Sequence, residues 1–174
     1  MNASKKYLVF TIDKESYAIP IAKVQEVIRY LPITQLHEAS KFLKGVVNLR
    51  GRIIPIIDMR LKFGLEEKLY SDRTIFVIVE ILGAKDINSL GLAVDAVHDV
   101  VDLEDGAINK TPEIGFKFRN KYLYGIAQVD ARMIMILNLD AILSSEEVIE
   151  IGESLEKPER SEEHTSELQS RQVI

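Results

Sequence analysis

Short apolar runs separated by polar turns recur along most of the chain. The runs are rich in valine and isoleucine and are bounded by glycine, proline, asparagine or aspartate, a pattern typical of β-strands. The predicted strands are Tyr7–Ile12, Tyr17–Ile21, Val24–Tyr30, Val46–Arg50, Ile53–Ile57, Thr74–Ile81, Leu90–Val94, Val97–Leu103, Leu123–Val129 and Met133–Leu137. The pattern therefore predicts an all-β chain.

The segment Lys44–Gly64 carries the most information. Two apolar runs flank a turn at Gly51, which predicts a β-hairpin. Pro55 removes one backbone donor from the second run, so that strand is expected at a sheet edge or with a bulge. Asp58 precedes a short helical pattern over Met59–Phe63, where a carboxylate suits a helix N-terminus. Polar residues that a purely structural hairpin would not need crowd this segment: Asn48, Arg50, Arg52, Asp58, Arg60 and Lys62.

The second half of the chain repeats the apolar pattern of the first. YAIPIAKVQEVI, from Tyr17, aligns without a gap with LGLAVDAVHDVV, from Leu90, and the segment from Gly45 aligns with that from Gly125. We interpret this as duplication of one small β unit; the alternative is chance similarity between apolar strands. Five short, twisted strands can protect their edges by curling into a barrel.

The two copies differ in charge although their apolar skeletons agree. The first copy has Arg50, Asp58 and Arg60 where the second has Asp130, Asn138 and Asp140. A requirement of the fold should act on both copies, whereas a contact with a partner need not. The difference favours a recognition role for the polar residues of the first copy.

NLRG followed by PIIDMRLKF resembles the CheW family, the adaptor of bacterial chemotaxis arrays. The likeness extends to FTIDKESYAIPIAKVQEVI, LGLAVDAVHDVV and YLYGIAQVDARMIMILNLDAIL, and spans roughly residues 5–150. It implies an all-β fold of two tandem five-stranded SH3-like barrels packed together in a domain over 5–152. The units would span about 7–63 and 74–143, with strand exchange between them allowed. Short helices are expected after the first barrel and near the C-terminus, the latter capped by Ser144 or Ser145.

The resemblance also implies two protein-binding surfaces. The surface for the chemoreceptor tip would use Val24, Glu26, Asn48 and Arg50. The surface for the regulatory domain of the histidine kinase CheA would include Arg52, Ile54, Asp58, Arg60, Leu61 and Phe63. Structural alternatives are that Arg50 holds its own turn, that Asp58 only caps its helix, and that Phe63 belongs to the core.

The function implied is a coupling protein that links methyl-accepting chemoreceptors to CheA and supports receptor control of the kinase. Its location would be cytoplasmic, at membrane-associated receptor arrays, without insertion into the membrane. One alternative is the CheW-like part of a CheV-type coupling protein that was truncated before its receiver domain. A more distant alternative is a small barrel that binds oligonucleotides, with Tyr30 or Tyr70 for stacking and with the cations Arg50, Arg52, Arg60 and Lys62.

Composition narrows the function classes. The chain has 174 residues, of which 47% are hydrophobic and 28% charged, as in a soluble globular protein. Its net charge of −5 argues against a general nucleic-acid binder. His37 and His98 lie far apart without neighbours at metal-ligand spacing, and the acidic run from Asp95 to Gly106 does not fit a calcium loop. No catalytic residue, metal site or cofactor is predicted, so an enzyme is only a remote possibility.

The C-terminal segment stands apart from this pattern. Residues 153–174 form a polar tail, and RSEEHTSELQS, from Arg160, resembles the translation of a common sequencing adapter. A disordered acidic tail is the plainer alternative. We exclude Arg160–Ile174 from functional reasoning, His164 included.

Overall fold

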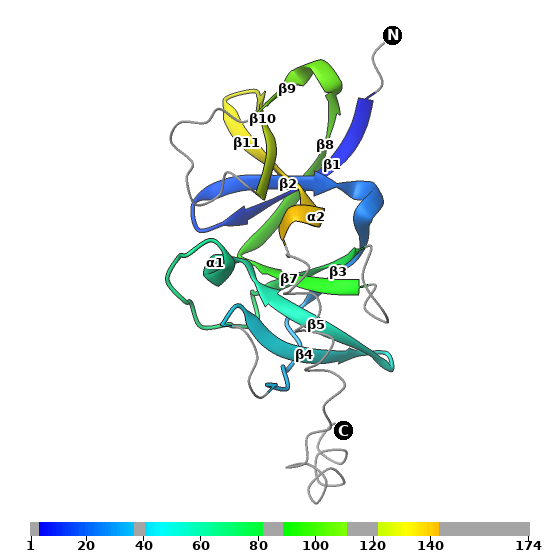
Figure 1. The fold of residues 1–174 in the computed structure, drawn as a ribbon, viewed down its shortest axis with the longest axis vertical. Coiled ribbons are helices and arrows are strands. Elements are labelled where there is room, and N and C mark those ends of the chain that lie inside the picture. Colours follow the sequence, from blue (N-terminus) through cyan, green and yellow to red (C-terminus); the bar gives the residue numbers. More distant parts are fainter. Residues whose placement is uncertain (1–3, 37–40, 82–88, 111–121, 143–174) are drawn as a thin grey trace, which may run out of the picture.

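The computed structural model describes residues 4–36, 41–81, 89–110 and 122–142, as two β-sheets with short helical turns (Figure 1). The elements are β1 (Ser4–Ile12), β2 (Glu15–Pro20), η1 (Ile21–Lys23), β3 (Val24–Arg29), β4 (Leu43–Leu49), β5 (Arg52–Asp58), α1 (Met59–Lys62), β6 (Ile75–Glu80), β7 (Ser89–Val94), β8 (Ala96–Glu104), η2 (Asp105–Ala107), β9 (Ile108–Lys110), β10 (Leu123–Val129), β11 (Arg132–Leu137) and α2 (Leu139–Ile142). The helix predicted after Ser144 or Ser145, the polar tail and His37 lie outside the described residues.

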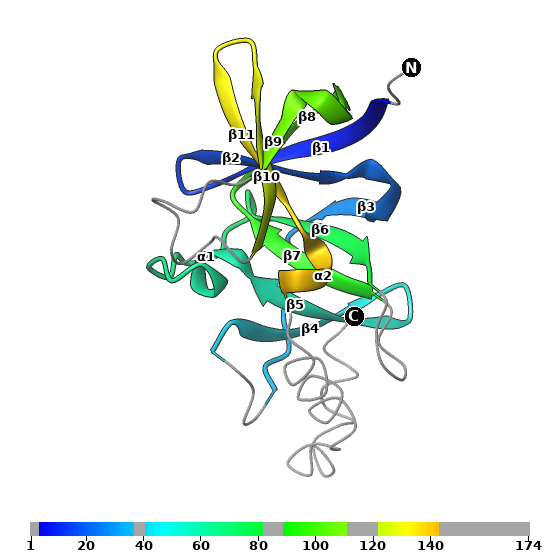
Figure 2. The ribbon, with the colours of Figure 1, turned by 45° about the horizontal axis from the view of Figure 1, so that its top comes forward.

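The strands form a six-stranded sheet in the order β8-β1-β2-β11-β10-β9 and a five-stranded sheet in the order β3-β6-β7-β5-β4. The first lies above the second in Figures 1 and 2. The prediction of a mostly β chain with short helices is therefore confirmed. The finer prediction of two five-stranded barrels differs from the structure. One sheet gains a sixth strand, β9, and within the described residues the two edge strands of each sheet share no ladder.

Each sheet combines strands from both halves of the chain. The β1–β2 hairpin joins β8 to β11, and the β6–β7 hairpin joins β3 to β5. A parallel ladder makes each junction, with Ala18 beside Ile136 in one sheet and Gly91 beside Ile56 in the other. These are matching positions in the alignment of the two copies. The two sheets are thus built alike, from one hairpin of one copy and three or more strands of the other.

Apolar side chains form three clusters, one inside each sheet and one between the sheets. β1 contributes to two of them, because Tyr7 and Val9 pack within the six-stranded sheet while Leu8 and Phe10 pack between the sheets. β6 behaves likewise, with alternate residues in the five-stranded sheet and in the shared cluster. Both strands are buried on both faces, which explains why their sequences are continuously apolar.

A glycine in each sheet allows a second backbone to pass close by. A Cβ on Gly45 would lie 2.2 Å from the carbonyl oxygen of Thr34, and one on Gly125 would lie 2.5 Å from that of Asn109. Thr34 and Val46 exchange two backbone hydrogen bonds of 2.8 Å, which draw the chain after β3 onto β4. The two sheets therefore curl by the same device at matching positions.

Pro55 does not mark an edge strand. β5 lies between β7 and β4, and β7 pairs with it only from Ile56 onward. The β4–β5 ladder shifts register between Leu43 and Gly45, but the extra residue, Lys44, lies in β4, so β5 carries no bulge in that ladder. This interior strand tolerates the proline because its parallel ladder with β7 begins only after the position where Pro55 lacks an N–H.

Candidate docking surfaces

Three of the four residues predicted to bind a receptor, Glu26, Asn48 and Arg50, come together at the β4–β5 turn. Glu26, on the edge strand β3, forms an ion pair with Arg50, in the β4–β5 turn. Arg50 has a positive φ of 53°, and the turn is held by Asn48, whose Oδ1 accepts a hydrogen bond of 2.8 Å from the N–H of Gly51. Asn48 therefore positions Arg50, and Arg50 is joined to Glu26. The pair has the exposure of a surface ion pair, with Arg50 68% and Glu26 29% exposed.

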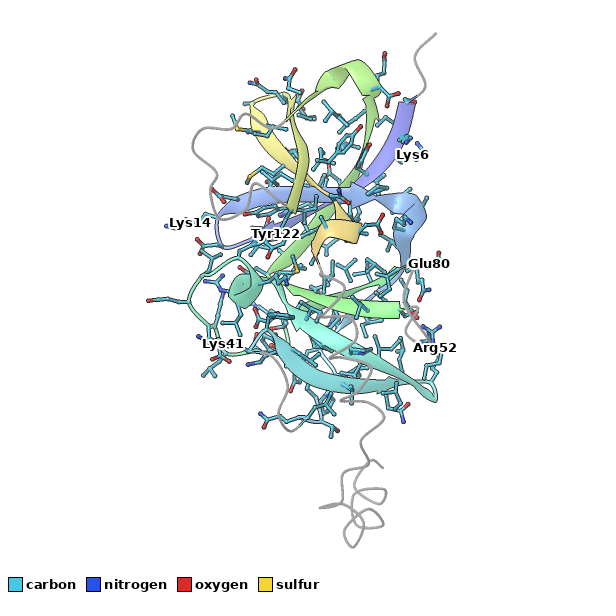
Figure 3. The ribbon with its side chains drawn as sticks, in the orientation of Figure 1. Lys6, Lys14, Lys41, Arg52, Glu80 and Tyr122 are labelled. Carbon is cyan, nitrogen blue, oxygen red and sulfur yellow. The ribbon has the colours of Figure 1, made fainter. Side chains whose placement is uncertain are left out.

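A second polar contact extends this surface toward β7. Gln25 Oε1 accepts hydrogen bonds from Arg52, at 3.2 Å, and from the hydroxyl of Ser89, at 2.9 Å. Figure 3 shows Arg52 at the free end of the β4–β5 hairpin, with Glu80 nearby at the same side of the molecule. Sequence reasoning did not single out Gln25 or Ser89, because only the sheet topology brings β7 next to β5.

Alternate residues of β3 differ in exposure, as the two-residue period of a strand requires. Val24, Glu26 and Ile28 are half-buried, whereas Val27 is 42% exposed. On the hairpin, Ile53 is 53% exposed and lies opposite Asn48. Val27 is thus a surface residue rather than a core residue. β3 and the β4–β5 hairpin thus carry exposed apolar side chains, Val27 and Ile53, as well as the Glu26–Arg50 ion pair. We call the set Gln25, Glu26, Val27, Arg50, Arg52 and Ile53 the β3–hairpin surface.

The residues predicted to bind a kinase are divided between the core and the surface. Ile54, Asp58 and Phe63 are 1%, 1% and 5% exposed, so their side chains are inaccessible to a partner in this conformation. Arg52 is exposed and Leu61 is partly exposed. Arg52 and Leu61 can therefore contact a partner directly. Ile54, Asp58 and Phe63 can affect binding only by holding β5 and α1 in place.

Asp58 is the buried charged residue of the described core. As predicted, it begins α1, and its Oδ1 accepts a hydrogen bond of 3.1 Å from the N–H of Leu61. Its Oδ2 accepts a hydrogen bond of 2.7 Å from the hydroxyl of Tyr70. Burial raises the pKa of the Tyr70 hydroxyl above its ordinary value, and the hydrogen bond to Asp58 raises it further. Asp58 thus ties the loop before β6 to α1.

Arg60 connects the two sheets. Its guanidinium contacts Asp95, between β7 and β8, at 2.8 Å, and Asp13, in the β1–β2 turn, at 3.3 Å. Asp95 also accepts a hydrogen bond of 2.7 Å from the backbone N–H of Asp13. The Arg60 side chain is only 15% exposed, so this contact is partly desolvated. Figure 3 shows the β1–β2 turn at Lys14, on the same side as α1.

Replacing Arg60 with alanine should destabilise the chain by about 1–2 kcal/mol, because two carboxylates then lose their partly buried partner. Equilibrium urea unfolding would measure the change. Lys6→Ala is the matched control, since its pair with Asp102 is 61% and 59% exposed, and it should cost at most about 0.5 kcal/mol. Equal effects of the two substitutions would show that Arg60 does not hold the sheets together.

Two acidic residues of β8 have cationic partners. Asp99 lies 3.5 Å from Arg132, and Asp102 lies 3.0 Å from Lys6. His98 is exposed and its Nε2 contacts the hydroxyl of Thr11. Among the residues with described positions, no group of three or more His, Cys, Asp or Glu side chains could hold a metal ion. The same part of the chain has no helix long and apolar enough to cross a membrane.

Comparison with known proteins decides the family. Residues 6–147 match the family profile described as a CheW-like domain. The chain belongs to the CheW family. This confirms the resemblance inferred from the sequence, and also the prediction of a non-enzymatic protein, because the family consists of adaptors.

The similarity to individual CheW proteins covers most of the chain. The chain is 36% identical to the chemotaxis protein CheW of Klebsiella aerogenes, over 83% of this chain and 84% of that protein. It is 27% identical to that of Bacillus subtilis, over 84% and 91% respectively. The crystal structure of the scaffolding protein TtCheW from Thermoanaerobacter tengcongensis superimposes with a TM-score of 0.73 at 35% identity, covering 83% of this chain and 91% of that one.

The geometry does not favour the oligonucleotide alternative. Tyr70 is packed inward with its hydroxyl on Asp58, so its ring is not a platform for a base. Arg50 and Arg60 are paired with carboxylates. Binding to single strands needs exposed aromatic rings beside free cations. Tyr70, Arg50 and Arg60 do not provide these, and the ring of Tyr30, 36% exposed, packs against Tyr70 and Phe76.

Proposed function

We propose that this CheW-family chain is a scaffold that couples chemoreceptors to a CheA-type histidine kinase and supports receptor control of that kinase. The observation that carries the proposal is the β3–hairpin surface in a chain of this family. Two residues remote in sequence, Glu26 and Arg50, come together there as an ion pair. A protein that holds two partners raises their effective concentration without any chemistry of its own.

The receptor tip is proposed to bind at Val24, Glu26, Asn48 and Arg50. Glu26 and Arg50 supply the charged contacts, and Asn48 acts indirectly by holding the turn. Val24 packs partly against the core between the sheets, so its role is to hold β3 in place. Val27, on β3, and Ile53, on the β4–β5 hairpin, are exposed and are proposed to add apolar contact area.

The kinase regulatory domain is proposed to bind along β5 and α1, through Arg52 at the β4–β5 turn and Leu61 in α1, at the other end of the strand (Figure 1). The buried Ile54, Asp58 and Phe63 would shape that region from within. Arg60 would contribute by fixing the two sheets relative to each other. In this arrangement Arg52 and Leu61 are accessible to a partner while the apolar core stays buried.

Three finer features also belong to the proposal. Each sheet is an SH3-like barrel in outline, supported by the Thr34–Val46 bridge and by η2, which links the edge strands β8 and β9. The domain spans 5–152, with units at about 7–63 and 74–143 that exchange hairpins. The chain works in the cytoplasm, at receptor arrays next to the membrane.

Glu26→Arg should weaken binding to a receptor-tip fragment by about ten-fold or more, because the introduced cation faces Arg50 in place of a carboxylate. Isothermal titration with the purified fragment measures this, and thermal unfolding verifies that the variant remains folded. Asp99→Arg, at the matching position of the second copy, is the control and should bind normally. Unchanged affinity of Glu26→Arg would contradict the assignment of this surface.

A further inference from the structure

A cavity of about 300 Å³ is lined mainly by residues of the six-stranded sheet and of α2. Its floor is formed by Ile136, Leu137 and Leu139, which are nearly fully buried. Exposed charged residues, among them Lys5 and Asp140, line it as well. An apolar floor with a few polar groups around it is the usual character of a ligand site, and the volume is at the lower end of that class.

The five-stranded sheet has a cavity in the equivalent place. The alignment of the two copies, together with the ladder registers, pairs the residues that line both. The shared positions are Asp58 and Asn138, Arg60 and Asp140, Thr74 and Lys5, and Ala93 and Pro20. The two cavities are therefore the same feature of the duplicated unit.

The two cavities differ in volume because one of them contains a ring. In the five-stranded sheet the volume left is about 50 Å³. Tyr70 fills the rest, with its hydroxyl 2.7 Å from Asp58 and its ring packed edge-on against Phe76 at 6.1 Å. Lys44 lies over the ring, 5.6 Å from its centre.

The walls of the larger cavity offer matching contacts. Tyr7 stands where Phe76 stands, and Tyr124 stands where Lys44 stands. Asn138 replaces Asp58, and its Oδ1 accepts a hydrogen bond of 3.1 Å from the N–H of Asp140. Its amide nitrogen is then the donor suited to a phenol oxygen. Two aromatic walls and one donor suit a phenol ring.

We propose that this cavity binds the aromatic side chain of a partner protein, preferably tyrosine, as the equivalent cavity binds Tyr70. The position equivalent to Tyr70 in the other copy is Met1, and neither it nor the next two residues, Asn2 and Ala3, carry an aromatic ring. The charges of Lys5 and Asp140 can pair with polar groups on either side of the incoming tyrosine. This proposal does not depend on which surfaces bind the receptor and the kinase.

The test is an NMR titration of the ¹⁵N-labelled full chain with the capped pentapeptide Gly-Gly-Tyr-Gly-Gly. The peptide should cause saturable shifts at the amides of Tyr124 and Asn138, and the same peptide with leucine should bind about ten-fold more weakly. Tyr124→Ala should weaken binding by about three- to ten-fold. Met133→Ala is the control: it lies on the same sheet, is 59% exposed and is outside the cavity.

Several results would overturn the proposal. One is the absence of saturable shifts, or equal binding by Tyr124→Ala and the unaltered chain. Another is binding of free p-cresol but not of the peptide, which would assign the cavity to a small molecule. A third is tighter binding by the double variant Phe116→Ala, Phe118→Ala, which would show that the chain's own segment competes for the cavity.

Discussion

Replacing Gly45 with alanine is expected to lower the free energy of unfolding by about 3 kcal/mol. The added Cβ would lie 2.2 Å from the carbonyl oxygen of Thr34 and 2.6 Å from a methyl carbon of Ile33. Gly45 also has a φ of 146°, which L-residues rarely adopt. Neither obstacle can be relieved by turning a flexible side chain, because Thr34 contributes backbone that is hydrogen-bonded to Val46. The substitution therefore separates the chain after β3 from β4.

Equilibrium urea unfolding measures this effect. Gly106→Ala is the matched control, since its Cβ would meet no atom within 4 Å, and it should change stability by less than about 0.5 kcal/mol. Gly125→Ala should cost nearly as much as Gly45→Ala, because its Cβ would lie 2.5 Å from the backbone oxygen of Asn109. A loss below about 1 kcal/mol for Gly45→Ala would mean that this close approach does not hold the sheet in its curled form.

Asp58→Ala is expected to destabilise the chain by about 3 kcal/mol, through two losses of about 1–2 kcal/mol each. The first is the cap of α1, since the N–H of Leu61 loses its acceptor. The second is the partner of the partly buried Tyr70 hydroxyl, which then loses Asp58 as its acceptor. The cost of an unsatisfied buried hydroxyl exceeds the net gain of an ordinary hydrogen bond.

Asn138→Ala, at the matching position of the second copy, provides the control for Asp58→Ala. Asn138 is exposed and only its contact with the N–H of Asp140 is lost, so the cost should be about 1 kcal/mol or less. Combining Asp58→Ala with Tyr70→Phe should cost less than the sum of the two single changes, by about 1 kcal/mol, because both remove the same hydrogen bond. Strict additivity would contradict the contact. Urea unfolding of all four variants provides the comparison.

The sequence predicts the strands well because their signal is local. Valine and isoleucine runs and the glycine-containing turns lie within the strands and hairpins themselves, and the positions of β2, β5 and β11 agree with them. β9 was not predicted, since three residues carry too little pattern to be recognised alone. Its pairing with β10 depends on contacts between segments distant in sequence.

The assignment of strands to sheets could not be predicted from apolar pattern alone. β1 and β6 are apolar on both faces, so their sequences do not say which face packs inside a sheet and which packs between sheets. The structure resolves this by placing each hairpin with the other copy's strands. The resemblance to the CheW family allowed such an exchange but did not require it.

For the candidate site, sequence reasoning located the region better than the roles of its residues. Glu26 and Arg50 were predicted on the same surface, and the structure joins them. Ile54 and Phe63 turn out to be buried. The sequence could not show this, because an apolar residue in a β-strand or at a helix end gives no signal of whether it faces the core or a partner. The partners of Arg60, Asp13 and Asp95, could not be found without the fold, because they lie in turns of other strands.

Reconstitution of coupling gives the most direct test of the scaffold function. Vesicles bearing a chemoreceptor would be sedimented with a CheA regulatory domain, with and without this chain, and the fraction of the kinase domain in the pellet would be measured. The chain should raise that fraction at least about ten-fold, and Glu26→Arg should abolish the increase while leaving binding to the isolated kinase domain intact. Sedimentation of the kinase domain that is equal with and without the chain would contradict a coupling role.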